Sequence, residues 1–198
     1  MAVVALKKEG IAFDSGLTSA ELREIEKRYD FRFPQDLCEF LSLGLAVSPG
    51  FPNWRTDTLQ RLKDVIPIAE HMNWPANGIC FDVEHDNFWM QDWGPKPQNS
   101  QEAFHLAREK VKEAPTLIPV FQPRFLPADP LMDGNPVLSV WQTDIIYYGL
   151  DLPTYLANKF HFASAKRENG NKPPRRIRFW SDIIERADAE FEMERGGP

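Results

Sequence analysis

The chain has 198 residues, a formal net charge of −6 at pH 7 and a pI near 5.3. Its 42% hydrophobic and 26% charged residues are typical of a globular protein, which excludes collagen, a coiled coil and wholesale disorder. The negative charge argues against nucleic acid and anionic lipid as partners, and no apolar stretch is long enough to span a membrane. We therefore expect one domain over residues 1–198, with its core at about 15–186.

The cysteines and the start of the chain indicate the compartment. Cys38 and Cys80 lie in apolar runs, so we expect two buried free thiols in a reducing cytosol. The short apolar start at residues 1–6 has no positively charged segment before it, so we expect no secretory signal. The predicted localisation is therefore cytoplasmic.

The first elements predict a helical hairpin. Thr18 and Glu21 have the spacing of a capping box, which begins a helix over residues 18–29. Pro34 opens a second helix, in whose first turn its missing N–H is harmless, and Gly44 is a stop signal. We expect both helices to pack on the rest of the domain.

The next segments predict a helix and then a β-hairpin. Asp57 or Thr58 can cap a helix whose apolar residues are spaced by three, three and one: Leu59, Leu62, Val65 and Ile66. Residues 79–85 and 88–93 then have the character of two strands joined by a turn at Asp86 and Asn87.

The second half of the chain predicts strands interrupted by single helices. Ser100 caps a helix that Pro115 stops, and Asp151 caps another that runs through Phe160. The predicted strands cover 117–121, 137–142 and 144–148, with Pro119 placing the first at an edge or a bulge. A short helix at 179–184 completes an α+β fold, in which the N-terminal helical hairpin packs on a mainly antiparallel β-sheet with further helices.

One stretch of the chain is positively charged, although the chain as a whole is negatively charged. Residues 166–178 hold six basic residues and one acidic residue. The turn signals within this stretch favour a solvated basic loop, and a phosphate-contacting arm is the sharper alternative. The last residues, 195–198, are expected to fray.

No catalytic or cofactor-binding motif is present in the sequence, so we assign no catalytic, cofactor or metal residues. The nearest candidate is the alternation of Asp82, Glu84 and Asp86, which would place three carboxylates on one face of a strand. A solvated hairpin face is the favoured interpretation; a hard-cation site and a pair for acid–base chemistry remain open. Cys38 as a nucleophile is a further alternative, although a packing role is the default on its helix.

Tryptophan and arginine point to a partner-binding surface, because exposed Trp and Arg dominate protein interfaces. Trp54 lies beside Arg55 in a proline-rich loop, and Trp93 ends the predicted acidic hairpin. Gln142 to Asp144 is a polar turn or a recognition edge. The residues assigned to partner binding are Trp54, Arg55, Asp82, Glu84, Asp86, Trp93 and Asp144.

Several motifs in fixed order resemble the SUKH superfamily, whose founding members are the fungal cell-wall regulators Smi and Knr. They begin with the capped helix and its Phe33-Pro34 step and extend over roughly residues 15–186. The other quoted motifs are Phe51-Pro52-Asn53-Trp54-Arg55, Gly78-Ile79-Cys80-Phe81-Asp82, Phe88-Trp89, Trp93-Gly94, Leu117-Ile118-Pro119-Val120-Phe121, Gly134-Asn135-Pro136-Val137, Thr143-Asp144-Ile145-Ile146-Tyr147-Tyr148-Gly149 and Phe179-Trp180-Ser181-Asp182. The chain departs from the family at Ser42-Leu43-Gly44-Leu45, where many members have Asn-Gly-Gly, and in the basic loop.

This resemblance implies binding rather than catalysis. The chain is similar to stand-alone bacterial members, which often resemble cytoplasmic immunity proteins that occlude a cognate polymorphic toxin, frequently a nuclease. No catalytic residue and no cofactor are carried over by the resemblance. The alternatives are a scaffold or regulatory module like the fungal relatives, and a metal-dependent hydrolase that uses the Asp82–Asp86 cluster. We expect a monomer with a protein partner.

Overall fold

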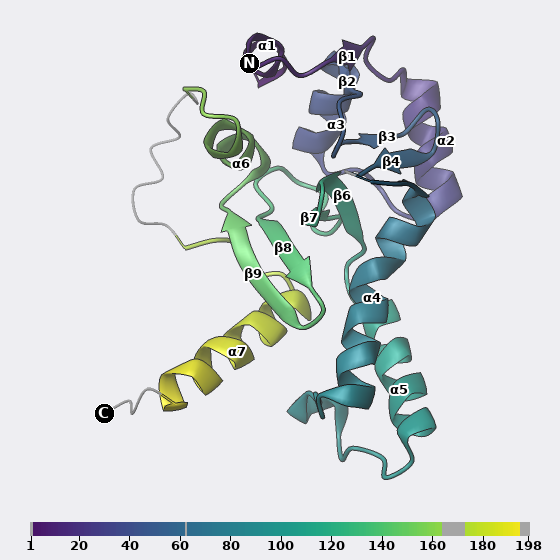
Figure 1. The fold of residues 1–198 in the computed structure, drawn as a ribbon, viewed down its shortest axis with the longest axis vertical. Coiled ribbons are helices and arrows are strands. Elements are labelled where there is room, and N and C mark those ends of the chain that lie inside the picture. Colours follow the sequence, from purple (N-terminus) through teal and green to yellow (C-terminus); the bar gives the residue numbers. More distant parts are fainter. Residues whose placement is uncertain (1, 62, 164–172, 195–198) are drawn as a thin grey trace.

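The computed structural model describes residues 2–61, 63–163 and 173–194 (Figure 1). The described helices are α1 Ala2–Lys8, α2 Ser19–Tyr29, α3 Gln35–Leu43, α4 Ile68–His85, α5 Ser100–Lys112, α6 Leu152–Lys159 and α7 Trp180–Glu194, with a 3₁₀ turn at Gln91–Trp93. The described strands are β1 Phe13–Asp14, β2 Leu45–Ala46, β3 Pro52–Asn53, β4 Thr58–Gln60, β5 Val65–Pro67, β6 Leu117–Phe121, β7 Arg124–Pro127, β8 Val137–Trp141 and β9 Asp144–Gly149.

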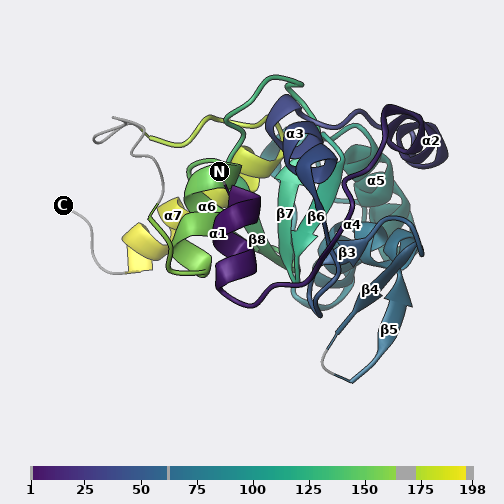
Figure 2. The same cartoon turned by 90° about the horizontal axis from the view of Figure 1, so that it is seen from above.

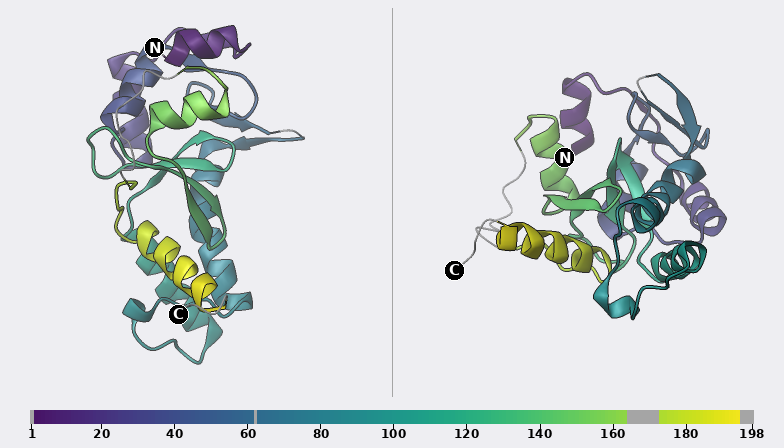
Figure 3. Two further views of the ribbon diagram at one scale, coloured as in Figure 1. Left: turned by 90° about the vertical axis from the view of Figure 1, so that its left-hand side faces the viewer. Right: turned by 60° about the horizontal axis from the view of Figure 1, so that its bottom comes forward.

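The α+β class is confirmed, and every strand pairing described is antiparallel. Small sheets form from β1 and β2 and from β3, β4 and β5, while β6, β7, β8 and β9 form a four-stranded sheet in that order. The helix α4 runs from the level of the sheet down through the lower part of the molecule, next to α5 (Figure 1). Figure 3 shows α6 on one side of the sheet and α7 on the other.

Two hydrophobic cores meet at the four-stranded sheet, because successive residues of a strand point to opposite faces. On β7, Phe125 packs with α4, α5 and α7, whereas its neighbour Leu126 packs with the helices α1, α2, α3 and α6. Both side chains are fully buried. The sheet therefore lies between two cores, one shared with α4, α5 and α7 and the other with α1, α2, α3 and α6.

Local capping signals are confirmed with small shifts of position. Thr18 caps α2, and Glu21 closes the capping box by accepting the Thr18 N–H at 2.8 Å. Pro34 is the N-cap of α3 rather than its first helical residue. Asn99, not Ser100, caps α5 by accepting from the N–H groups of Gln101 and Glu102.

The helix predicted from Asp57 or Thr58 is wrong, because this segment folds as the hairpin of β4 and β5. Leu59 and Ile66 are directly opposite each other in this hairpin and both are buried. Two apolar residues seven positions apart lie on the same face of a helix, but they can equally form a cross-strand pair in a hairpin. Figure 2 shows β4 and β5 projecting from the body of the molecule.

The predicted hairpin at 79–93 is also wrong. Residues 79–85 are the second half of α4, and the segment after Asn87 is irregular and ends in the 3₁₀ turn. The helix α4 continues through both Pro75 and Gly78. Its buried residues recur at helical spacing: Ile68, His71, Pro75, Ile79, Asp82 and Val83.

The helices and strands predicted in the second half are confirmed, but the strand β7 was not predicted. Pro119 lies on the edge strand β6, next to an irregularity in its register with β7. The last helix, α7, extends to Glu194 and is longer than predicted. Residues 166–172 of the basic loop and the terminal 195–198 lie outside the described residues. Both cysteines are free, with Cys80 buried and Cys38 half-buried, and no described helix is long and apolar enough to cross a membrane.

Candidate interaction site

The two tryptophans predicted as exposed partner contacts are buried, which corrects their assignment. Trp54 is 3% exposed and packs edge-on against Tyr29, Phe31 and Phe33. Trp93 is 7% exposed and lies among aromatic rings of the other core. Their large apolar area makes them core residues, so neither can contact a partner without unfolding its surroundings.

Arg55 forms hydrogen bonds within the molecule and is not available as a partner contact. Its Nε donates to Glu21 at 2.6 Å, and its two terminal nitrogens donate to the carbonyls of Ser15 and Gly16. The guanidinium and the Thr18 cap together lower the pKa of Glu21 to about 2. Arg55 thus joins the segment before α2 to the loop after β3.

The predicted acidic face does not form, because residues 82–86 belong to a helix and not to a strand. Asp82 is buried and accepts hydrogen bonds from the N–H and hydroxyl of Thr143, whereas Glu84 and Asp86 are exposed. The Asp82 bond brings α4 next to Asp144, the exposed first residue of β9. Within the described part of the chain, no three His, Cys, Asp or Glu side chains gather as metal ligands. The strand geometry on which the metal-dependent hydrolase alternative rested is therefore wrong.

One face of α4 instead holds the turns of two β-hairpins. His71, Gly78 and Asp82 lie on this face, at spacings of seven and four residues. His71 Nε2 is 2.8 Å from the carbonyl of Gln122 in the β6–β7 turn, and Asp82 holds Thr143 in the β8–β9 turn. At Gly78 an added Cβ would lie 2.7 Å from Cα of Gln142, so only glycine permits this approach.

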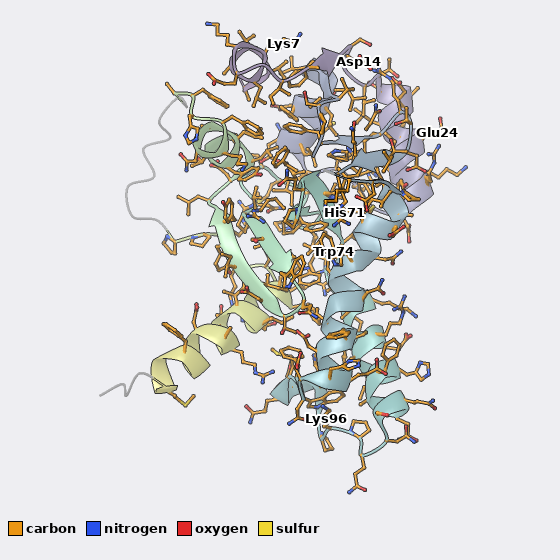
Figure 4. All side chains as sticks on the ribbon, in the orientation of Figure 1. Lys7, Asp14, Glu24, His71, Trp74 and Lys96 are labelled. Carbon is orange, nitrogen blue, oxygen red and sulfur yellow. The ribbon has the colours of Figure 1, made fainter. Side chains whose placement is uncertain are left out.

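This arrangement creates a cleft between α4, the β4–β5 hairpin and the two turns. We call it the Trp cleft; its volume is about 410 Å³, and it is lined by Leu59, Arg61, Lys63, Asp64, His71, Trp74, Gln122, Pro123 and Trp141. The rings of Trp74 and Trp141 pack edge to face, with 5.5 Å between their centres. The Arg61 guanidinium lies 5.2 Å from the centre of the Trp74 ring. Trp141 is 59% exposed. Figure 4 shows His71 and Trp74 on the side of α4 that faces the sheet.

His71 supplies a neutral acceptor at the base of the cleft. Burial lowers the pKa of its ring to about 4, so the ring is uncharged at neutral pH. A carbonyl can only accept, so the hydrogen bond to Gln122 places the ring proton on Nε2. Nδ1 then carries a lone pair, and among the described residues this buried atom has no hydrogen-bond partner.

The cleft continues onto an uncovered part of the sheet. We call this part the open sheet face; it consists of Arg124, Ser139, Trp141, Ile146 and Tyr148. The Arg124 guanidinium lies 3.9 Å from the centre of the Tyr148 ring and lowers the pKa of that phenol. Ile146 and Tyr148 are both exposed, so apolar surface extends beyond Trp141.

Sequence reasoning missed Trp74 and Trp141, although signals for both exist. Trp141 alternates with the buried Leu138 and Val140 on β8, which places it with Ser139 on the opposite face. Trp74 follows His71 by three residues on α4, a helical spacing in a segment for which no element was predicted from the sequence.

Comparison of the chain with family models, curated proteins and solved structures finds no match. The resemblance to the SUKH superfamily therefore remains a prediction that rests on the residues of this chain.

Proposed function

We propose that this chain is a non-catalytic protein-binding module, and that it acts as a cytoplasmic immunity protein that neutralises a cognate toxin by occlusion. The observation that carries the binding proposal is the joining of Trp74, Trp141 and Arg61 in one cleft beside exposed apolar residues. Trp, Tyr and Arg supply most of the binding energy in protein interfaces. The immunity role is supported by the SUKH resemblance of the sequence.

The surface available suits a partner of ordinary size. A standard interface covers about 800 Å² on each partner, and the described surface totals 11525 Å². The Trp cleft supplies a concave centre for such an interface, and the open sheet face extends it. An acidic chain would also be steered towards a basic toxin such as a nuclease.

The experiment is affinity capture from the native cell lysate, with the unchanged chain and with Trp141→Ala as bait. We expect a single stoichiometric partner with a toxin-like domain, lost with the Trp141→Ala bait because the exposed ring is a binding contact. Phe81→Ala is the matched control: Phe81 is an exposed aromatic residue on α4, outside the Trp cleft, and its removal should not affect capture.

A growth assay then separates immunity from the alternative. Expression of the captured domain should stop growth, and co-expression of this chain should restore it unless Trp141 is replaced by alanine. Many weak partners without toxicity would favour the scaffold alternative. A partner that Trp141→Ala retains as well as the unchanged chain does would contradict this choice of surface.

A further inference from the structure

The charge of the Trp cleft is opposite to that of the whole chain. Its described lining holds two cations, Arg61 and Lys63, and one carboxylate, Asp64. The open sheet face adds Arg124 next to it, whereas Asp144, exposed and directly opposite Trp141 on β9, adds a second carboxylate. Three cations against two carboxylates leave the surface around Trp141 with a small positive charge, in a chain whose net charge is −6.

These cations are free to meet a partner. Arg61 and Asp64 are 3.7 Å apart and both about half exposed, and such a pair contributes little, about 0–1 kcal/mol. Lys63 has no ion-pair partner among the described residues. Arg124 lies over Tyr148, and one terminal nitrogen of its guanidinium makes a long hydrogen bond of 3.4 Å to the carbonyl of Pro123. A carboxylate from outside would therefore replace no strong internal bond.

The positions of the cations define the shape of the ligand. Arg61 lies on the α4 side of Trp141, through its contact with Trp74, and Arg124 lies on the sheet side, opposite Ser139. Between them is the exposed Trp141 ring. A ligand that matches this surface has a large apolar or aromatic group between two groups of negative charge.

We infer that the Trp cleft binds an extended acidic segment of the partner protein, with an aromatic or large apolar residue flanked by Asp or Glu. The inference rests on the proposed function. The apolar residue enters between Trp74 and Trp141, and the carboxylates pair with Arg61 and Lys63 on one side and with Arg124 on the other. A nucleic-acid strand fits less well, because Ile146 and Tyr148 extend the surface with exposed apolar area, whereas a strand needs a continuous cationic groove along its backbone.

The test measures fluorescence anisotropy with the full chain and three labelled probes. The probes are the peptide Gly-Asp-Glu-Phe-Leu-Glu-Asp-Gly, its counterpart Gly-Lys-Lys-Phe-Leu-Lys-Lys-Gly and oligouridylate. We expect the acidic peptide to bind at least about tenfold more tightly than either other probe, and less tightly as salt is raised. Tighter binding of the basic peptide or of oligouridylate would overturn the inference, as would no saturable binding of the acidic peptide up to about 1 mM.

A matched pair of charge reversals shows whether the effect is local. Arg61→Glu with Lys63→Glu should weaken the acidic peptide about tenfold. Arg23→Glu with Lys27→Glu changes the net charge equally on the exposed face of α2, outside the Trp cleft, and should leave affinity unchanged. Equal losses from both pairs would overturn the inference.

The captured partner separates failure of this inference from failure of the proposed function. If Trp141→Ala abolishes capture but the reversal at Arg61 and Lys63 does not change it, the interaction surface is correct and the acidic ligand is wrong. If neither variant changes capture, the surface itself is wrong.

Discussion

At the scale of single residues, the burial of an aromatic or titratable side chain determines its role. Trp54 and Trp141 have the same side chain, but one is in an aromatic cluster and the other faces solvent. His71 is held neutral by burial although its ordinary pKa is near 6.5. These differences lead to two predictions.

Replacing Trp54 and Trp141 should affect stability very differently. Trp54→Ala leaves a cavity among Tyr29, Phe31 and Phe33, and should lower the free energy of unfolding by about 3–5 kcal/mol. Trp141→Ala removes a largely exposed ring and should lower it by only about 0.5–1.5 kcal/mol, the contribution of the edge-to-face contact with Trp74. Urea unfolding measures both; a larger loss for Trp141→Ala would contradict the structure.

Stability should depend on pH through His71. Its pKa is about 4 in the folded chain and near 6.5 when exposed, so between these pH values only the unfolded chain binds the proton. The contribution of His71 to the free energy of unfolding is therefore fully present above pH 6.5. It decreases by about 3 kcal/mol as the pH falls from 6.5 to 4.

The matched variant for this prediction is His71→Gln, whose side-chain amide can donate to Gln122 but does not titrate. Urea unfolding at several pH values should show that the unchanged chain loses more stability on acidification than this variant does. A constant difference between the two from pH 7 to pH 4 would show that His71 is not held neutral.

At the scale of elements, α4 positions the Trp cleft through its contacts with the two hairpin turns. The contact at Gly78 is the closest, since the β8–β9 turn lies against the helix backbone. The contacts at His71 and Asp82 fix the turns on either side of it. Any side chain at position 78 must therefore separate the turn from the helix.

Gly78→Ala should destabilise the chain by about 1–3 kcal/mol, although alanine is the better helix former by about 1 kcal/mol. The added Cβ would overlap Cα of Gln142 and move Trp141 away from Trp74. Urea unfolding measures the first effect, and weakening of the Trp–Trp exciton signal in circular dichroism measures the second.

Asn77→Ala is the control for that variant, because Asn77 is an exposed neighbour on the same helix. It changes helix propensity without touching the turn, so both signals should remain close to those of the unchanged chain. If Gly78→Ala were as stable as Asn77→Ala, the close approach of turn and helix would not exist in solution.

At the scale of the whole molecule, the four-stranded sheet contributes side chains to two hydrophobic cores, one on each of its faces. Neighbouring residues on β7 enter different cores, Phe125 with α4, α5 and α7 and Leu126 with the N-terminal helices. Neither core can lose the sheet without exposing the other. We therefore expect the single domain to unfold in one step, as small domains generally do.

Phe125→Ala and Leu126→Ala form a matched pair for this prediction. Each should lower stability by about 2–5 kcal/mol and shift the same single calorimetric transition. Two separate transitions, each moved by only one of the variants, would show instead that the cores unfold independently.

Elements whose signals are local could be predicted from the sequence. The Thr18 and Asp151 caps, the stop at Gly44, and the alternating strands around the 142–143 turn each act within a few residues. The α+β class follows from the order of these elements. Such signals remain valid in the tertiary structure because the hydrogen bonds that they describe are formed between neighbours.

The secondary structure of the ambiguous segments and the burial of the tryptophans depend on tertiary contacts. Leu59 and Ile66 fit a helix or a hairpin, and α4 continues through Pro75 and Gly78 because its buried face packs against the sheet. Trp54 and Trp93 were expected to be exposed and are buried, whereas Trp141 is exposed. Burial depends on contacts between distant segments, which one-dimensional spacing does not encode, so the candidate site appears only once α4 and the hairpin turns are in contact.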